Sequence, residues 1–395
     1  MIVLGLNSGT SVDSIDVAVG RFTAAGGVVT LQPLGFLGHP WPASTRREIL
    51  DALPPGRSGA ADWCRLDTLI GQELARAALA GAAAFAPDGR VDLVGSHGQT
   101  LYHWVEDGRV RGTLQAGQPA WIAEAVGCPV VADLRSADVV AGGQGAPLMA
   151  LLDGLWLGSD SSQSHPTVVL NIGGIANVTV LAGPEAPARA WDTGPGNCLI
   201  DAAAQHRVGL PCDLDGRLAA VGRVDAGLLS RLLADPYYRE LPPKSTGREH
   251  FTADYVDGLL SAQIDTADLI ATLTELTART IADSIASAGV PARVVVSGGG
   301  AHNPALMGRL AALIPAPVVG SDALGLPVDG KEAYLFALLA YLSVHGCAGT
   351  VPSRAGAATG ARHPSVLGSL TPPTPLNLPA MAQPRALRVV QEGHP

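Results

Sequence analysis

The sequence predicts an α/β protein in which one strand–turn–strand unit occurs twice. Residues 1–20 run as an apolar strand, a Gly/Ser/Asn turn and a second apolar strand, and residues 167–181 repeat this order. A third glycine cluster, residues 297–303, follows a β-branched run and precedes an apolar segment with helical spacing. Strands that alternate with helical segments are typical of α/β folds.

Composition limits the size and the partners of this protein. Its 395 residues, 47% hydrophobic, predict two or three domains with sizeable cores. With 15% charged residues and a net charge of −9, a surface that follows nucleic-acid phosphates is excluded. The five cysteines are scattered and form no C-x-x-C pair, which indicates buried thiols in a reducing compartment. We expect a cytoplasmic protein without a membrane segment.

The glycines of the two hairpins indicate an anion site. Glycine at a turn lets backbone N–H groups approach an anion, and small hydroxyl or amide side chains add donors. One such hairpin alone is more simply an ordinary turn. Repetition of the hairpin and the third cluster, where Asn303 can cap a helix that begins at Pro304, favour a nucleotide site. Two hairpins of this kind can hold one polyphosphate from two sides.

Between the hairpins, two predicted strands each lead into a polar loop. Residues 60–86 have the spacing of a helix, and the strand 91–95 leads into the loop 96–100, which contains His97 and Gln99. The strand 128–132 leads into the loop 133–138 and a glycine-rich stretch. Polar residues at strand ends usually line a cleft. A domain boundary is expected before residue 167.

In the second half, residues 267–288 predict an amphipathic helix that is capped by Asp265 or Thr266 and closed by Gly289. Residues 333–344 are almost wholly apolar and predict a buried helix. From residue 371 the chain is rich in proline and lacks periodicity, which predicts an extended or partly disordered tail.

Two loops of the second half carry candidate chemistry. Asp192 lies in a Gly/Pro turn before an apolar run, where a carboxylate is either a helix cap or, beside phosphate hairpins, a general base. Lys244, one of the two lysines of the chain, follows a Pro-Pro pair and has Arg248 nearby, which favours anion or sugar binding over a merely solvated loop.

One motif is a decoy. Residues 325–331 have the spacing of a phosphate-binding P-loop, but Glu332 stands where a metal-binding Ser or Thr is required. A carboxylate there repels phosphate and can instead accept hydrogen bonds from a neutral ligand. The histidines and cysteines have no zinc spacing, so no metal ligands are predicted and a divalent ion is expected to arrive with the nucleotide.

The paired hairpins resemble the phosphate loops of the actin, Hsp70 and sugar kinase superfamily. Longer motifs, in order, are similar to those of the anhydro-N-acetylmuramic acid kinase family from residue 2 to about residue 372: residues 8–11 with Asp13 and Asp16, 96–100, 133–147, 171–177, 192–197, 242–249 and 298–304. The resemblance implies two actin-like, ribonuclease H-like domains around a central nucleotide and substrate cleft. Domain I is expected at residues 1–130 plus about 346–372, domain II at 131–345 and a tail at 373–395.

The resemblance also implies the reaction and its residues. Water would open 1,6-anhydro-N-acetylmuramic acid and ATP with Mg²⁺ would phosphorylate the freed O6, in cytoplasmic peptidoglycan recycling by a homodimer. Asp192 would be the base. The implied ATP contacts are Gly9, Thr10, Ser11, Val12, Asp13, Ser14, Ile15, Asp16, Asn171, Gly173, Gly174, Gly298, Gly299, Gly300 and Asn303. The implied sugar contacts are His97, Gln99, Asp192, Gly194, Asn197, Lys244, Arg248 and Glu332.

The chain departs from the family pattern at two positions of the first hairpin. Asn7 replaces the usual methionine and Ser14 the usual glycine. An added amide and a lost backbone freedom can change nucleotide affinity or substrate choice. Two alternatives therefore stay open: a kinase for another 1,6-anhydrosugar such as levoglucosan, and a non-catalytic actin-like protein that binds nucleotide.

Overall fold

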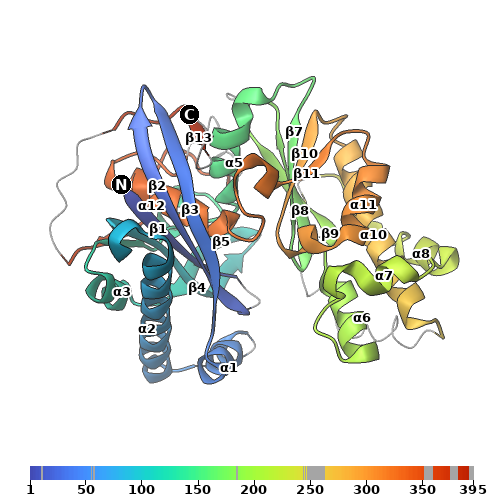
Figure 1. Cartoon of the computed structure of the whole chain (residues 1–395), viewed down its shortest axis with the longest axis horizontal. Coiled ribbons are helices and arrows are strands. Elements are labelled where there is room, and N and C mark those ends of the chain that lie inside the picture. Colours follow the sequence, from blue (N-terminus) through green and yellow to red (C-terminus); the bar gives the residue numbers. More distant parts are fainter. Residues whose placement is uncertain are drawn as a thin grey trace. The chain divides into compact units, whose positions relative to one another are not determined.

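The computed structural model describes residues 1–9, 12–54, 56, 58–183, 186–242, 244, 246, 263–350, 359–373 and 381–390. The chain divides into two compact units, each with its own sheet (Figure 1). Unit 1 comprises residues 1–159, 184–187 and 325–395, and unit 2 comprises residues 160–183 and 188–324. The predicted α/β class is confirmed.

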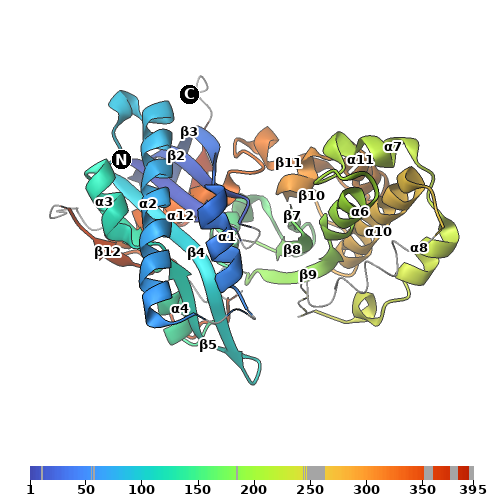
Figure 2. The same ribbon diagram turned by 90° about the horizontal axis from the view of Figure 1, so that it is seen from below.

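Unit 1 is built on a mixed sheet whose strand order is β12-β6-β4-β1-β2-β3-β13, with β5 paired to β4. Strands β1, β2 and β3 are antiparallel, whereas β4 and β6 run parallel to β1. The long β4–β5 hairpin continues beyond the sheet (Figure 2). The strands are β1 Ile2–Ser8, β2 Ser14–Ala25, β3 Val28–Pro40, β4 Leu93–Glu106, β5 Arg109–Ala116, β6 Val130–Ala132, β12 Ser369–Thr371 and β13 Ala386–Val389.

Unit 2 repeats this topology. Its sheet order is β11-β10-β7-β8-β9, in which β7, β8 and β9 are antiparallel while β10 and β11 run parallel to β7. The repeated hairpin of the sequence is therefore the first hairpin of two sheets with the same order and directions. The strands are β7 Thr167–Ile172, β8 Ile175–Leu181, β9 Arg189–Pro195, β10 Arg293–Ser297 and β11 Val318–Gly320.

Two helices cover opposite faces of the unit 1 sheet. Helix α2 (Ala60–Phe85) packs on the face that carries the buried Leu4 and Leu6. Helix α12 (Lys331–Val344) lies so close to the other face that a Cβ on Gly5 would stand 1.9 Å from the carbonyl oxygen of Ala333. Alternation along β1 thus sends large side chains to one helix and leaves glycine under the other. The other helices of unit 1 are α1 Ala43–Ala52, α3 Pro119–Val126, α4 Ser136–Val140 and α5 Met149–Leu157.

In unit 2, α10 (Thr266–Ala286) and α11 (Pro304–Leu313) pack on the sheet, and α6, α7 and α8 gather against α10. The predicted caps are confirmed: Asp265 accepts from the N–H of Ala267 at 2.8 Å, and Asn303 accepts from that of Leu306 at 3.1 Å. The remaining helices are α6 Cys198–Val208, α7 Arg217–Val221 and α8 Ala226–Leu232. Short 3-10 helices span Pro87–Gly89, Gly158–Asp160, Leu214–Gly216, Pro236–Arg239, Gly299–His302 and Ser321–Leu324.

The units change at other positions than the sequence suggested. Domain changes were expected after residues 130 and 345, whereas the units change after residues 159 and 324. The reason is packing, because α4, α5 and α12 contact strands of the first sheet. Part of the expected tail is also ordered, since β13 pairs with β3. Among the described residues, no helix is long and apolar enough to cross a membrane.

Candidate functional site

In unit 2 the tip of the β7–β8 hairpin is tied to the start of α6. The N–H of Gly196 donates to the carbonyl of Gly174 at 2.8 Å, and the N–H of Asn197 donates to that of Gly173 at 2.9 Å. Both bonds hold the tip beside the first turn of α6, where helix N–H groups lack intrahelical acceptors. The N–H of Cys198 also donates to the carbonyl of Gly174, at 3.1 Å, so these bonds fix the position of the hairpin tip relative to α6.

The turn after β10 lies against the same hairpin tip. Gly298 has φ +83°, and a Cβ there would stand 2.6 Å from Oδ1 of Asn171. A Cβ on Gly300 would stand 2.3 Å from Cγ2 of Ile172. Glycine is thus required at both positions by close packing, and the structure brings together the second hairpin and the third glycine cluster, both within unit 2.

Three other glycines of this group are not required by packing. A Cβ would meet nothing closer than 3.6 Å at Gly173, 3.9 Å at Gly174 and 4.0 Å at Gly299, and none of the three has a positive φ. Gly174 and Gly299 are exposed. Bare backbone where the chain itself has room for a side chain is what the approach of a phosphate needs. Asn303 uses its Oδ1 to cap α11, and its contact with ATP stays a prediction.

Asp192 lies on β9 and is held by the segment that follows α8. Its carboxylate Oδ2 accepts from the N–H of Thr246 at 3.0 Å, and its carbonyl accepts from the hydroxyl of Tyr237 at 2.8 Å. The N-cap of α6 is Asn197, five residues later, so Asp192 is not the cap of that helix. The structure thus removes the capping hypothesis for α6, and the general-base hypothesis stays a prediction.

Lys244 lies in the same segment and bonds within it. Its Nζ donates to the carbonyl of Tyr237 at 2.9 Å and lies 4.4 Å from the centre of that ring. Burial lowers the pKa of the Lys244 ammonium, and Glu240 opposes this change. At Gly194, φ is +145° and a Cβ would stand 2.9 Å from Tyr238, so glycine there serves packing. Arg248 lies outside the described residues.

In unit 1 the carboxyl end of β1 lies beside the middle of the parallel strand β4, which places Ser8 opposite Gln99. Ser8 Oγ donates to Gln99 Oε1 at 2.7 Å and accepts from Trp41 Nε1 at 3.2 Å. The amide of Gln99 donates to the carbonyl of Gly9 at 3.3 Å. Gln99 is fully buried, so it supports the first hairpin through these hydrogen bonds and is not itself exposed to a ligand.

The tip of this hairpin is partly described. Thr10 and Ser11 lie outside the described residues. Val12 has φ +53°, and its carbonyl accepts from Nε of Arg46 at 2.7 Å. Ile15 is 0% exposed and belongs to the hydrophobic core, so only its backbone can meet a ligand.

Carboxylates gather where this hairpin meets the first turn of α12. Asn7 Nδ2 donates to Oε2 of Glu332 at 2.9 Å, and Ser14 Oγ donates to Oδ1 of Asp16 at 3.2 Å. Burial raises the pKa of Asp16 from 3.8 to about 7, while the Ser14 hydroxyl opposes the rise. The negative charges of Glu332, Asp13 and Asp329 raise it further. Glu332 itself is exposed at the surface of unit 1.

His97 is a buried, neutral imidazole. Its Nδ1–H donates to the carbonyl of Gly98 at 3.0 Å, its Nε2 accepts from Nε of Arg135 at 2.8 Å, and its ring stacks on Phe336 at 4.6 Å. Burial, and next the Arg135 charge, hold the pKa of His97 well below its usual value. Both ring nitrogens are engaged within the chain, so His97 orients Arg135.

Lys331, the lysine of the P-loop-like motif, is buried in an ion pair with Asp153. Lys331 Nζ lies 2.7 Å from Oδ1 of Asp153, and the two side chains are 3% and 1% exposed. Burial raises the pKa of Asp153, and the Lys331 ammonium opposes this. A lysine sealed in an ion pair cannot reach a phosphate, which removes the P-loop interpretation.

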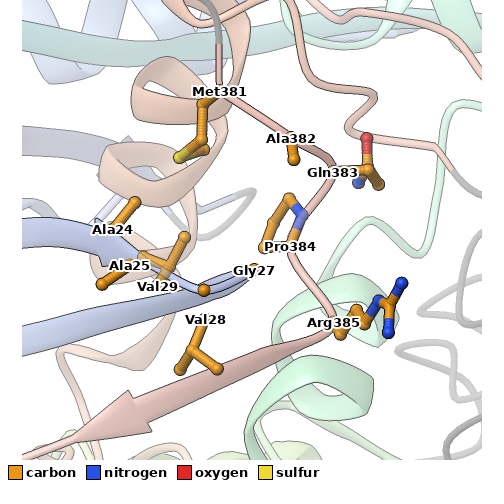
Figure 3. A pocket seen from close by; sticks show the side chains of 11 residues that line it. Ala24, Ala25, Gly27, Val28, Val29, Met381, Ala382, Gln383, Pro384 and Arg385 are labelled. Carbon is orange, nitrogen blue, oxygen red and sulfur yellow. The ribbon is translucent and has the colours of Figure 1, made fainter.

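A cavity of about 830 Å³ opens in unit 1 between the β2–β3 turn and residues 381–385 (Figure 3). Its lining is mostly alanine, glycine and valine, with Gln383 and Arg385 at one side. The β2–β3 turn is at the end of β2 remote from Ser14. No predicted site residue lines this cavity.

The family of this chain follows from its similarity to known proteins. A model described as "Anhydro-N-acetylmuramic acid kinase" matches residues 1–373. The chain belongs to the anhydro-N-acetylmuramic acid kinase family. Proteins of that name from Streptomyces coelicolor and Streptomyces avermitilis are 52% and 50% identical to it, over 99% of this chain and 99% and 100% of theirs. One from Rhodococcus erythropolis is 49% identical over 94% of both chains.

In this member of the anhydro-N-acetylmuramic acid kinase family, tertiary contacts reveal residues that the sequence did not single out. Arg135 is the main one, because it joins His97 to the carbonyl of Gly145, at 2.6 Å, and its charge faces Glu332 and Asp138. Its position in a polar loop after a strand was the available signal. Trp41 and Tyr237 had no local signal, since their roles depend on partners far along the chain.

Proposed function

We propose that this protein opens 1,6-anhydro-N-acetylmuramic acid with water and phosphorylates O6 with ATP, giving N-acetylmuramic acid 6-phosphate and ADP. Membership of the family over nearly the whole chain supports the substrate. The observation that carries the reaction is Asp192, whose carboxylate is held by a backbone N–H in a segment beside the glycine turns of unit 2. A fixed carboxylate of this kind suits a general base.

The proposed reaction consists of hydrolytic ring opening followed by phosphoryl transfer. Asp192 accepts a proton from water as the water oxygen bonds to the anomeric carbon, and the bond between C1 and O6 breaks. O6 then bonds to the γ-phosphorus of ATP, and the bond to ADP breaks. Because hydrolysis supplies the nucleophile for transfer, the two steps are coupled.

We assign the phosphates of ATP to the glycine turns and the sugar to Glu332. This assignment is supported by the room that the chain leaves beside the backbone at Gly173, Gly174 and Gly299. Mg²⁺, when bound to ATP, neutralises phosphate charge. Among the described residues, no group of three His, Cys, Asp or Glu side chains is placed to hold a metal ion, so no protein ligand is assigned to it.

The test of the mechanism combines isotope and mutation. Turnover in ¹⁸O-labelled water is expected to place label on C1 of the phosphorylated product, after correction for anomeric exchange. Asp192→Asn keeps the shape and an acceptor for Thr246, and is expected to lower kcat by about a hundredfold to ten-thousandfold with nucleotide affinity unchanged. A near-normal kcat in this variant would remove Asp192 from the chemistry.

The test of the substrate is a panel of anhydrosugars assayed by mass spectrometry with ATP and Mg²⁺. We expect a single product, the 6-phosphate of N-acetylmuramic acid. Conversion of levoglucosan alone would establish the alternative kinase, and nucleotide binding without any product would establish a non-catalytic protein. We further propose that the protein acts in the cytoplasm as a homodimer in peptidoglycan recycling, which cell fractionation and sedimentation would test.

A further inference from the structure

Two side-chain donors of the first hairpin, Asn7 and Ser14, lie on one face of the unit 1 sheet. Asn7 of β1 stands directly opposite Asp16 of β2, so both side chains leave the same face. Ser14 precedes Asp16 by two residues on β2 and shares that face. Gly5, two residues before Asn7, marks it as the face covered by α12, whose first turn carries Glu332.

Each departure supplies a donor that the usual residue lacks. Asn7 donates to Glu332 at 2.9 Å and Ser14 donates to Asp16 at 3.2 Å. A methionine has no hydrogen to donate and a glycine has no side chain. Each donor reaches a different carboxylate, and neither bond could form from a methionine at position 7 or a glycine at position 14.

The surroundings explain why neutral donors matter here. Asp16 is faced by the charges of Glu332, Asp13 and Asp329, and the pKa of its carboxyl is raised to about 7. The cation that faces Glu332 among the described charges is Arg135, which is itself held by His97. An amide or hydroxyl donor steadies a carboxylate without adding a charge to the cluster.

Burial makes Asn7 the more rigid partner of its pair. Asn7 is 3% exposed, whereas Glu332 is exposed. An exposed glutamate otherwise samples several rotamers. A bond from a fixed amide selects the rotamer in which Oε2 is occupied, and leaves Oε1 as the oxygen that presents to a ligand.

We propose that Asn7 and Ser14 are positioning residues of this site: Asn7 orients the carboxylate of Glu332 for the sugar, and Ser14 orients that of Asp16 for the nucleotide. This inference rests on the proposed function for the identity of the two ligands. It assigns the two substitutions separate effects, which a general change in packing does not produce.

The experiment compares Asn7→Met, Ser14→Gly and a control in the full-length protein. The control is Tyr334→Phe, because Tyr334 lies on α12, is fully buried and donates to the carbonyl of Gly35 at 2.8 Å without touching a carboxylate. For each chain, kcat and both KM values are measured from pH 6 to pH 9, with thermal unfolding alongside.

Asn7→Met is expected to raise the KM for the sugar about fivefold while the KM for ATP stays within about twofold. Ser14→Gly is expected to raise the KM for ATP about fivefold while the KM for the sugar stays within about twofold. It also moves the acid limb of kcat/KM for ATP to higher pH, because the pKa of Asp16 rises further without the hydroxyl. Tyr334→Phe is expected to lower the unfolding temperature and change neither KM.

Equal changes in both KM values, no change in either, or the same pattern in Tyr334→Phe would overturn the inference. If Asn7→Met does not fold, Asn7→Leu keeps about the same size but cannot donate, and a near-normal sugar KM in that variant would also overturn it. A wild-type protein that converts only another anhydrosugar refutes the proposed function alone. The changes in KM between each variant and the wild type are then measured with that sugar. With no turnover at all, calorimetric Kd values for sugar and a non-hydrolysable ATP analogue replace KM.

Discussion

Asp16 is expected to lower the stability of the ligand-free protein at neutral pH, and Asp16→Asn to relieve this. The carboxyl is half-buried among other negative charges, and its pKa is raised from 3.8 to about 7. A raised pKa means that the folded state binds the proton more tightly than the unfolded state does. The free energy of unfolding therefore falls as pH rises from 3.8 to about 7, and the full loss is present above that range.

The size of the effect follows from the two pKa values. At 1.36 kcal/mol per pH unit, the difference corresponds to ~4 kcal/mol for a group shielded from water. Asp16 retains some solvent access, and screening reduces this to about 2 kcal/mol. For a unit of this size, such a change raises the unfolding temperature by about 4–8 °C.

The assay is thermal unfolding of the wild type and of Asp16→Asn from pH 4 to pH 9, without ligands. Asn can still accept from Ser14, so the shape and this bond are kept. The difference in Tm is expected to be near zero at pH 4 and to reach its plateau above pH 8. Asp88→Asn, at an exposed turn, makes the same change in formal charge and is expected to leave the profile as in the wild type. A difference independent of pH would refute the reasoning.

Two further outcomes follow from the packing. Lys331→Met is expected to lower the free energy of unfolding by about 3–5 kcal/mol, since it leaves Asp153 buried without its partner, and Lys331→Met with Asp153→Leu is expected to recover most of this in urea titrations. A near-neutral single variant would contradict the ion pair. Gly174→Val is expected to weaken binding of an ATP analogue at least about tenfold with little change in Tm, whereas Gly196→Ala is expected to lower Tm, because its Cβ would stand 2.3 Å from the carbonyl of Gly173. Calorimetry that finds unchanged binding in Gly174→Val would remove this turn from the nucleotide site.

Local patterns carried much of the fold. Strand periodicity and turn glycines predicted the two hairpins, and the caps at Asp265 and Asn303 were correct because a cap is decided by residues three or fewer positions away. The helix at residues 333–344 was also correct in type. The unit to which this helix belongs could not be predicted, because an apolar sequence indicates that a helix is buried but not which sheet it packs against.

Sequence motifs singled out candidate site residues on two separate parts of the second hairpin region. Gly173, Gly174 and Asp192 were identified by their turns, and the role of Asp192 stays a proposal. That Lys331 is sealed by Asp153 depends on a contact between residues far apart in the chain.

The sequence by itself determined the α/β class, the repeated hairpin and the family, because these depend on short-range periodicity and on ordered motifs. Tertiary structure alone decided that Asn7 meets Glu332, 325 positions away along the chain, and that Arg135 meets His97. The physical reason is that orientation, burial and charge at a site depend on which side chains the folded sheet and its covering helix bring within hydrogen-bond distance. No local pattern encodes those pairs.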